Sequence, residues 1–192
     1  MLYTIGKILF SIIFSLLFKW EITGAENIPD KGPLIICSNH ISWWDPPLVG
    51  CSIKRRIYFM AKEELFKNPI LGYILKAVGA FPIKRGEADR KAIRKSLEIL
   101  EQAKVLGLFP EGTRSKTGEL QKPEPGVALI ALKSNAQILP VAIKGPYKLF
   151  KPVKVIVGKP YRLSYSGGKL TTQILQQYSK QIMEKIKLLL GT

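Results

Sequence analysis

The chain has 192 residues, 46% of them hydrophobic and 23% charged, which predicts one folded domain with its own core and excludes a largely disordered protein. Thirty lysines and arginines against fourteen aspartates and glutamates give a formal charge of +16, which attracts polyanions such as nucleic acid or the anionic face of a bilayer. The sequence has no zinc-ligand spacing, aromatic-basic sheet motif or basic recognition helix, so we favour an anionic membrane surface over nucleic acid as the partner.

The first predicted element is an apolar helix at 2–18, "LYTIGKILFSIIFSLLF". A helix of about 17 residues is about 26 Å long, which falls short of a hydrocarbon core of about 30 Å. Its polar residues recur every three or four positions and form one narrow stripe: Thr4, Lys7, Ser11, Ser15 and Lys19. We therefore favour an anchor at 1–19 that lies in one leaflet, with a full span or a soluble packing helix as alternatives.

Short apolar runs then alternate with longer helical patterns. The runs predict buried strands at 34–37, 57–61, 80–83, 105–109, 138–143 and 153–158. The helical patterns lie at 89–104, 126–135 and 170–190, and the last repeats apolar residues at a spacing typical of an amphipathic helix. This alternation predicts an α/β fold for the domain at 20–192.

The stretch "SNHISWWDPP" contains the only histidine of the chain, His40, directly after a predicted strand. Asp45 precedes two prolines, which is typical of a helix start with aspartate as N-cap. A carboxylate placed there can hold one imidazole nitrogen while the other faces a substrate. An imidazole, with an ordinary pKa of about 6.5, accepts a proton near neutrality, whereas lysine and arginine are already protonated. The alternative is that Asp45 only caps the helix and His40 is a satisfied buried polar group.

The sequence contains no distinctive nucleophile for this base. There is no G-x-S-x-G elbow, and Cys37, Ser38 and Ser42 have no characteristic context. We therefore expect the nucleophile to belong to the substrate. Cys37 and Cys51 with one histidine are too few for a four-ligand zinc site or a disulfide framework, so we expect no metal and a reducing compartment.

The stretch "LFPEGTRS" at 108–115 places Glu111 and Arg114 in a turn at the end of a strand, where α/β sheets usually bind ligands. A guanidinium there can bind a phosphate through two hydrogen bonds. The alternative is a surface ion pair between Glu111 and Arg114. Lys84 and Arg85, which follow the strand at 80–83, leave the same two possibilities open.

Together these motifs resemble those of the glycerolipid acyltransferase family, in particular the bacterial 1-acylglycerol-3-phosphate acyltransferases, over about residues 20–160. The N-H-x-x-x-x-D block corresponds to Asn39, His40 and Asp45, and G-x-F-P-I-x-R corresponds to Gly79, 81–83 and Arg85. The block F-P-E-G-T-R-S is complete at 109–115, and "ILPVAI" at 138–143 matches a proline-containing strand.

The resemblance implies an acyltransferase with a glycerolphosphate-acyltransferase-like sheet flanked by helices. It implies that His40, oriented by Asp45, deprotonates a glycerol hydroxyl of lysophosphatidate, which attacks the thioester of an acyl carrier protein or coenzyme A and yields phosphatidate. Neither a covalent acyl-enzyme nor a bound cofactor is implied. The residues implied to bind substrate are Lys62, Arg85, Glu111, Gly112, Thr113 and Arg114.

The membrane and the acceptor leave alternatives. We expect a monotopic or peripheral protein on the cytoplasmic face of the cell membrane, with Trp43 and Trp44 either at the interface or covering the core. The oxyanion of the reaction needs donors, for which the backbone amides of the Gly112 turn are candidates. Alternatives to lysophosphatidate acylation are acylation of another lysophospholipid or of glycerol 3-phosphate, or a catalytically dead basic membrane-binding protein.

Overall fold

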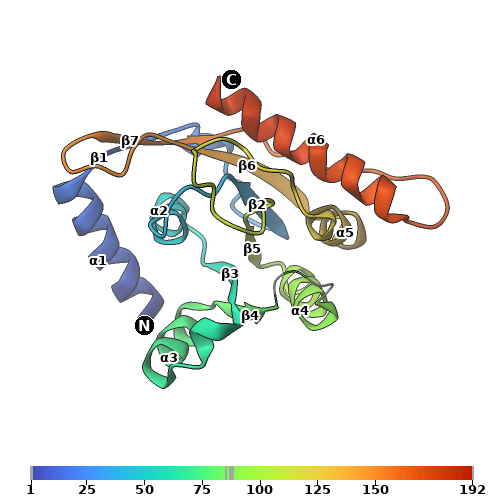
Figure 1. The fold of residues 1–192 in the computed structure, drawn as a ribbon, viewed down its shortest axis with the longest axis horizontal. Helices are drawn as coiled ribbons and strands as arrows, with labels where there is room; N and C mark the ends of the chain where they lie inside the picture. The colour runs from blue at the N-terminus through green and yellow to red at the C-terminus, as the bar shows by residue number, and fades with distance from the viewer. Residues whose placement is uncertain (1, 85, 87–88, 192) are drawn as a thin grey trace.

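The structure is a computed structural model that describes residues 2–84, 86 and 89–191. At its centre lies a seven-stranded sheet with the strand order β1-β7-β6-β2-β5-β3-β4 (Figure 1). The strands are β1 Lys19–Thr23, β2 Leu34–Ser38, β3 Ile57–Lys62, β4 Phe81–Ile83, β5 Val105–Leu108, β6 Gln137–Lys144 and β7 Pro152–Val157. Each predicted apolar run forms one of these strands, and the α/β prediction is confirmed.

Most of the sheet is parallel. β6, β2, β5, β3 and β4 run in the same direction, whereas β7 is antiparallel to β6. Strands of a parallel sheet are covered on both faces, so they are apolar without alternation, and all five residues of β2 are buried. The strand β1 was not predicted, because this edge strand, "KWEIT", alternates exposed and half-buried residues and contains no apolar run.

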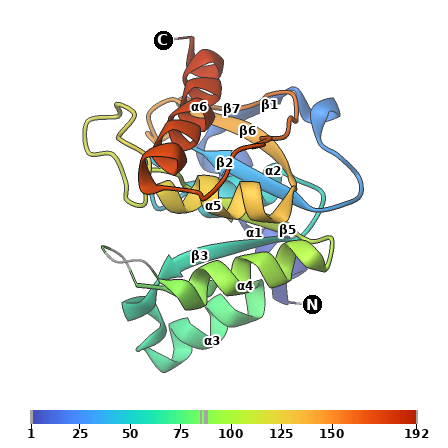
Figure 2. The same cartoon turned by 90° about the vertical axis from the view of Figure 1, so that its right-hand side faces the viewer.

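Helices cover both faces of the sheet. They are α1 Leu2–Leu17, α2 Asp45–Ser52, α3 Pro69–Val78, α4 Arg90–Glu101, α5 Pro125–Ser134 and α6 Thr172–Leu190, with short 3-10 turns η1 Ala25–Asn27 and η2 Glu63–Phe66. Figures 1 and 2 show α4, α5 and α6 on one side of the central strands and α1 and α2 on the other.

The alternation of β2 side chains explains these two layers. Ile35 and Cys37 pack into the core under α4, α5 and α6. Leu34 and Ile36 pack into the second core, under α1 and α2. The predicted helices correspond to α4, α5 and α6. α5 begins at Pro125 and ends at Ser134, and the left-handed backbone of the C-cap Asn135 (φ 48°) stops the helix.

α1 lies against the body of the protein through one face. Phe14 is fully buried, the Tyr3 hydroxyl accepts a hydrogen bond from Ile57 N (3.1 Å), and Lys7 Nζ donates to Ile53 O. Part of the polar stripe thus faces the protein, and the other face of α1 is exposed and apolar. Among the described residues, no helix is both long and apolar enough to cross a membrane.

Candidate active site

The site lies at the carboxyl edge of the parallel strands, where α/β sheets place ligands. His40 follows β2, and the "FPEGTRS" loop follows β5, which is the neighbouring strand. The Asn39 side chain holds this end of β2 to β6, because its amide donates to Ile143 O (2.9 Å) and its carbonyl accepts from Ile143 N (2.7 Å). The asparagine of the first motif therefore continues the pairing of the two strands beyond the end of β2.

The "FPEGTRS" loop holds His40 from three directions. The backbone N–H of His40 donates to Glu111 Oε1 (2.9 Å), and its carbonyl accepts from Ser115 N (2.8 Å). The ring of Phe109 stacks on the imidazole with a centroid distance of 4.1 Å, and the ring of Phe59 stacks on Phe109 (5.9 Å between centroids). Two motifs separated by about 70 residues thus form one site.

Asp45 holds the imidazole ring. Its Oδ2 is 2.7 Å from His40 Nδ1 and also accepts from Ile41 N (2.6 Å) and Ser42 N (2.7 Å). The other oxygen, Oδ1, accepts from the Tyr147 hydroxyl (2.6 Å). Because a carboxylate that receives N–H donors is an acceptor, Nδ1 carries the proton in this contact, and in the neutral imidazole Nε2 then has the lone pair.

The prediction that Asp45 is the N-cap of α2 is wrong. The N-cap is Trp44, and Asp45 is the first helical residue, with its carboxylate turned back to the preceding loop. Pro46 and Pro47 have no N–H, and Leu48 N donates to Trp44 O (2.9 Å), so no amide of the first turn is available to Asp45. The alternative that Asp45 only caps a helix is therefore wrong as well.

Glu111 is buried, with 3% of its surface exposed. Its two oxygens accept from His40 N and from Gln121 N (3.0 Å). Burial raises the pKa of Glu111, the two amides oppose this rise, and the charge of Asp45 adds to it. The alternative of a surface pair with Arg114 is wrong, because both carboxylate oxygens are bonded to backbone amides inside the protein.

Arg114 lies over the indole of Trp43, with its guanidinium carbon 3.8 Å from the ring centroid. Trp43 is 65% exposed. Trp44 instead packs into the core beside Phe14 (5.9 Å between centroids). Trp44 thus covers the core, whereas Trp43 is exposed at the surface, where its cation–π contact orients a guanidinium.

Gly112 forms the turn after Glu111 with a left-handed backbone (φ 66°). Its N–H donates to Phe109 O (3.0 Å), so this amide is already engaged and is not a donor for an oxyanion. Thr113 is exposed at the tip of the loop. Lys62 ends β3 at the same edge of the sheet and pairs with Glu64 (3.1 Å). Arg85 lies outside the described residues.

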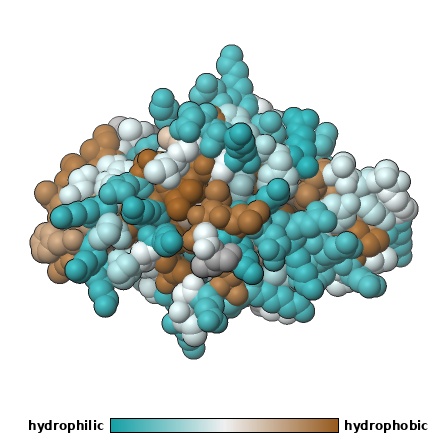
Figure 3. Space-filling model, turned by 90° about the horizontal axis from the view of Figure 1, so that it is seen from above, coloured by the Kyte–Doolittle hydropathy of each residue, from teal (hydrophilic) through white to brown (hydrophobic). Residues whose placement is uncertain are grey.

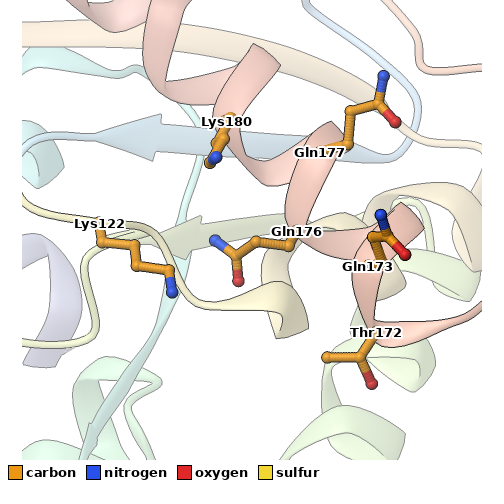
Figure 4. A pocket seen from close by; sticks show the side chains of 6 residues that line it. All are labelled: Lys122, Thr172, Gln173, Gln176, Gln177 and Lys180. Carbon is orange, nitrogen blue, oxygen red and sulfur yellow. The ribbon is translucent and has the colours of Figure 1, made fainter.

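A separate hollow of about 460 Å³ lies on α6, lined by lysine, amide and hydroxyl side chains (Figure 4). The lining residues are Lys122, Thr172, Gln173, Gln176, Gln177 and Lys180. They belong to none of the sequence motifs. Within the described part of the chain, no group of three or more histidine, cysteine or acidic residues could hold a metal ion.

Tyr147 is the residue of this site that sequence reasoning missed. It lies 102 positions after Asp45, in the β6–β7 loop at 145–151, outside every motif. A tyrosine next to a Gly-Pro turn has no local feature that predicts its partner. The stacking of Phe109 on His40 and the bridge made by Asn39 were also not predicted, although both residues belong to motifs.

Comparison with known proteins gives the following similarities. The family model described as Acyltransferase matches residues 19–144. The 1-acyl-sn-glycerol-3-phosphate acyltransferase of Bacillus subtilis is 30% identical over 92% of this chain and 90% of its own length. The Streptococcus pneumoniae protein of the same name is 34% identical over 69% of this chain and 52% of its own length. A crystal structure of the 1-acyl-sn-glycerophosphate acyltransferase of Thermotoga maritima superimposes with a TM-score of 0.70 over the whole chain and 79% of the other, at 24% identity, so the fold is shared.

Proposed function

This chain belongs to the acyltransferase family and is an acyltransferase, and from this premise we propose that it acylates the sn-2 hydroxyl of 1-acylglycerol 3-phosphate to give phosphatidate. The name and similar length of the Bacillus subtilis relative support this acceptor. The observation that carries the chemistry is the pair of His40 and Asp45, 2.7 Å apart at the carboxyl edge of the sheet.

His40 is the general base of this reaction. Its Nδ1–H is bonded to Asp45, so the lone pair of Nε2 is free to take the proton of the sn-2 hydroxyl. The hydroxyl oxygen attacks the thioester carbonyl and forms a tetrahedral oxyanion. When this intermediate collapses, the C–S bond breaks and the thiolate leaves with the proton from the imidazolium. The products are phosphatidate and the free thiol of the carrier, and no acyl group is bonded to the protein.

Asp45 orients the imidazole and stabilises its charged form. Backbone amides hold Asp45 Oδ2, and the amide and carbonyl of His40 are held by Glu111 and Ser115, so the base has little freedom to turn. Such fixed geometry accelerates a bimolecular step, because the reacting groups meet without further ordering. Glu111 therefore affects the acceptor indirectly, because it holds the backbone of His40 in place.

The acceptor phosphate binds Arg114, with Lys62 as a second charge. The stack on Trp43 holds the guanidinium plane, and a planar guanidinium matches two phosphate oxygens. Lys62 lies at the end of β3 and has to exchange its Glu64 partner for the phosphate. The amide of Thr113, which has no hydrogen-bond partner in the described part of the chain, is our candidate donor to the oxyanion. Arg85 remains a candidate phosphate ligand on the motif alone.

The outward face of α1 forms the membrane-binding surface. This face is apolar and exposed, and so is α3, which contacts α1. The β6–β7 loop joins them, since Phe150 N donates to Leu17 O (2.8 Å). The exposed apolar side chains are Leu2, Ile5, Ile8, Leu9, Ile12 and Leu16 of α1, Ile70, Leu71, Tyr73 and Ile74 of α3, and Leu149 and Phe150 of the loop. In Figure 3, hydrophobic residues gather at the end of the molecule where Figure 1 places α1 and this loop.

An exposed apolar patch of this kind on a basic protein fits an anionic lipid surface. α1 lies flat against the body through Tyr3, Lys7 and Phe14, so its outer side chains can enter one leaflet while the helix stays parallel to the surface. We therefore propose a monotopic or peripheral protein on the cytoplasmic face of the cell membrane, where acyl thioesters are available.

The test is an acyl-transfer assay with purified protein in detergent. Lysophosphatidate, another lysophospholipid, glycerol 3-phosphate and a phosphate-free monoacylglycerol are each offered with acyl-coenzyme A and with an acylated carrier protein. We expect phosphatidate from lysophosphatidate at the highest kcat/KM, and no turnover in His40→Ala, whose folding is checked by circular dichroism. A higher kcat/KM with glycerol 3-phosphate or the other lysophospholipid would replace our acceptor, and turnover in His40→Ala would exclude this base.

A further inference from the structure

Tyr147 touches the proposed catalytic pair from a loop that carries no motif. Its hydroxyl is 2.6 Å from Asp45 Oδ1. We infer that Tyr147 is a positioning residue, which holds the second oxygen of Asp45 and thereby sets the basicity of His40. The inference rests on the proposed role of His40 as general base and adds a third side chain to the pair.

The two oxygens of Asp45 have separate partners. Oδ2 accepts from His40 Nδ1 and from two backbone amides of the same loop. In the described part of the chain, Oδ1 accepts only from Tyr147. Asp45 is 0% exposed, and a buried carboxylate oxygen without a donor is strongly unfavourable. The tyrosine therefore supplies the donor that this buried oxygen needs.

The direction of this hydrogen bond follows from the environment of the phenol. Burial raises the pKa of Tyr147, and the negative charge of Asp45 raises it further, so the hydroxyl keeps its proton. A protonated phenol beside a carboxylate donates to it. The bond draws part of the carboxylate charge away from Oδ2, which weakens the attraction of Asp45 for an imidazolium. Removing the Tyr147 hydroxyl should therefore strengthen the attraction of Asp45 for an imidazolium.

The ring of Tyr147 is fixed by contacts independent of its hydroxyl. It packs edge-on against Phe18, just after the end of α1, with a centroid distance of 5.7 Å and an interplanar angle of 89°. The turn before it requires Gly145 (φ 127°), where a Cβ would lie 2.5 Å from Pro152 O. Replacing tyrosine by phenylalanine therefore removes one hydrogen bond and leaves the packing in place.

Other charged groups lie at this edge of the sheet and have to stay unchanged in the test. Glu111 binds the His40 amide from the "FPEGTRS" loop, and Arg114 of the same loop lies over Trp43. Lys62 with Glu64 lies at the end of β3. Tyr147→Phe alters none of these groups, so a change in the titration of His40 reports the loss of the Tyr147 hydroxyl.

The experiment uses the fact that His40 is the only histidine. In the full-length protein in detergent micelles, the imidazole Cε1–H resonance is followed against pH by NMR for wild type and Tyr147→Phe. We expect the midpoint to move to higher pH by about half a unit to one unit in the variant. In acyl-transfer assays, kcat/KM should fall about three- to tenfold on the acid limb and recover at high pH.

Tyr178→Phe on α6 is the matched control, because it removes a tyrosine hydroxyl that donates to Ser164 O (2.9 Å) away from the site. It should change neither the NMR midpoint nor the rate profile. In an Asp45→Ala background, Tyr147→Phe should leave the midpoint where it is, since no carboxylate transmits the effect. An unchanged midpoint in Tyr147→Phe, or a loss of rate that is equal at all pH values, overturns the inference. The NMR titration needs no substrate, so it tests the inference even when lysophosphatidate is not the acceptor.

Discussion

The guanidinium of Arg114 lies on an exposed indole and has no carboxylate partner among the described residues. This placement leaves its N–H donors for a ligand, whereas in an ion pair with Glu111 they would be occupied. At the scale of single residues, the "FPEGTRS" loop thus gives its two charged side chains different roles. Glu111 turns inward to hold the backbone of His40, and Arg114 turns outward over Trp43.

We expect Arg114→Ala to lower kcat/KM for lysophosphatidate about ten- to a hundredfold, because a charge-assisted hydrogen bond contributes about 1.5 to 3 kcal/mol. Arg114→Lys should restore part of this, since lysine offers a charge without the planar fork. With a phosphate-free monoacylglycerol, Arg114→Ala should change the already low rate little. Equal losses with both acceptors would show that Arg114 acts on the chemical step, and phosphate binding would have to be assigned elsewhere.

At the scale of elements, α1 is both a part of the core and an exposed surface. Phe14 and Phe18 are buried, so deleting residues 1–18 would open the core as well as remove the proposed anchor. The chain continues from α1 into β1, which pairs with β7. The division between residues 19 and 20 therefore stays a prediction, and substitutions on the outer face test the anchor more cleanly than a deletion.

We expect the double variant Ile8→Gln and Leu16→Gln to weaken binding to vesicles at least tenfold. Burying one aliphatic side chain in lipid contributes about 1.5 to 3 kcal/mol, and a loss of about 1.4 kcal/mol already lowers the affinity tenfold. Leu188→Gln on α6 is the control. Leu188 is as exposed as Leu16 (71% and 68%), but α6 lies on the side of the sheet opposite to α1. Sedimentation with vesicles measures the binding. Unchanged sedimentation of the double variant, or equal loss in the control, contradicts the anchor.

At the scale of the whole molecule, the charge of +16 acts over a longer range than any contact. Screening shortens this range to about 10 Å at 0.1 M salt. We therefore expect vesicles that contain phosphatidylglycerol to bind the protein more tightly than neutral phosphatidylcholine vesicles, with the difference disappearing as salt rises. The apolar contribution of α1 should persist at high salt. Equal binding to both vesicles at low salt would show that the charge serves another partner.

The sequence by itself determined the features that depend on neighbouring residues. Apolar runs of strand length predicted the buried strands, because a parallel sheet covered on both faces selects such runs locally. The pair of His40 and Asp45, five positions apart, was predicted for the same reason, since one short loop brings the two side chains together. The edge strand β1 was not predictable in this way, because a half-exposed strand has no continuous apolar run.

The tertiary structure alone decided which groups meet across long stretches of chain. Tyr147 reaches Asp45 only because the β6–β7 loop passes beside the end of α1, and no local pattern encodes that path. The structure also decided that Lys7 of the polar stripe of α1 faces the protein. It decided as well that Asp45 binds His40, while Trp44 is the N-cap of α2. The physical reason is common to these cases: a hydrogen-bonding group takes the partner that the packed fold brings within about 3 Å, and sequence spacing predicts that partner only within one turn, strand or loop.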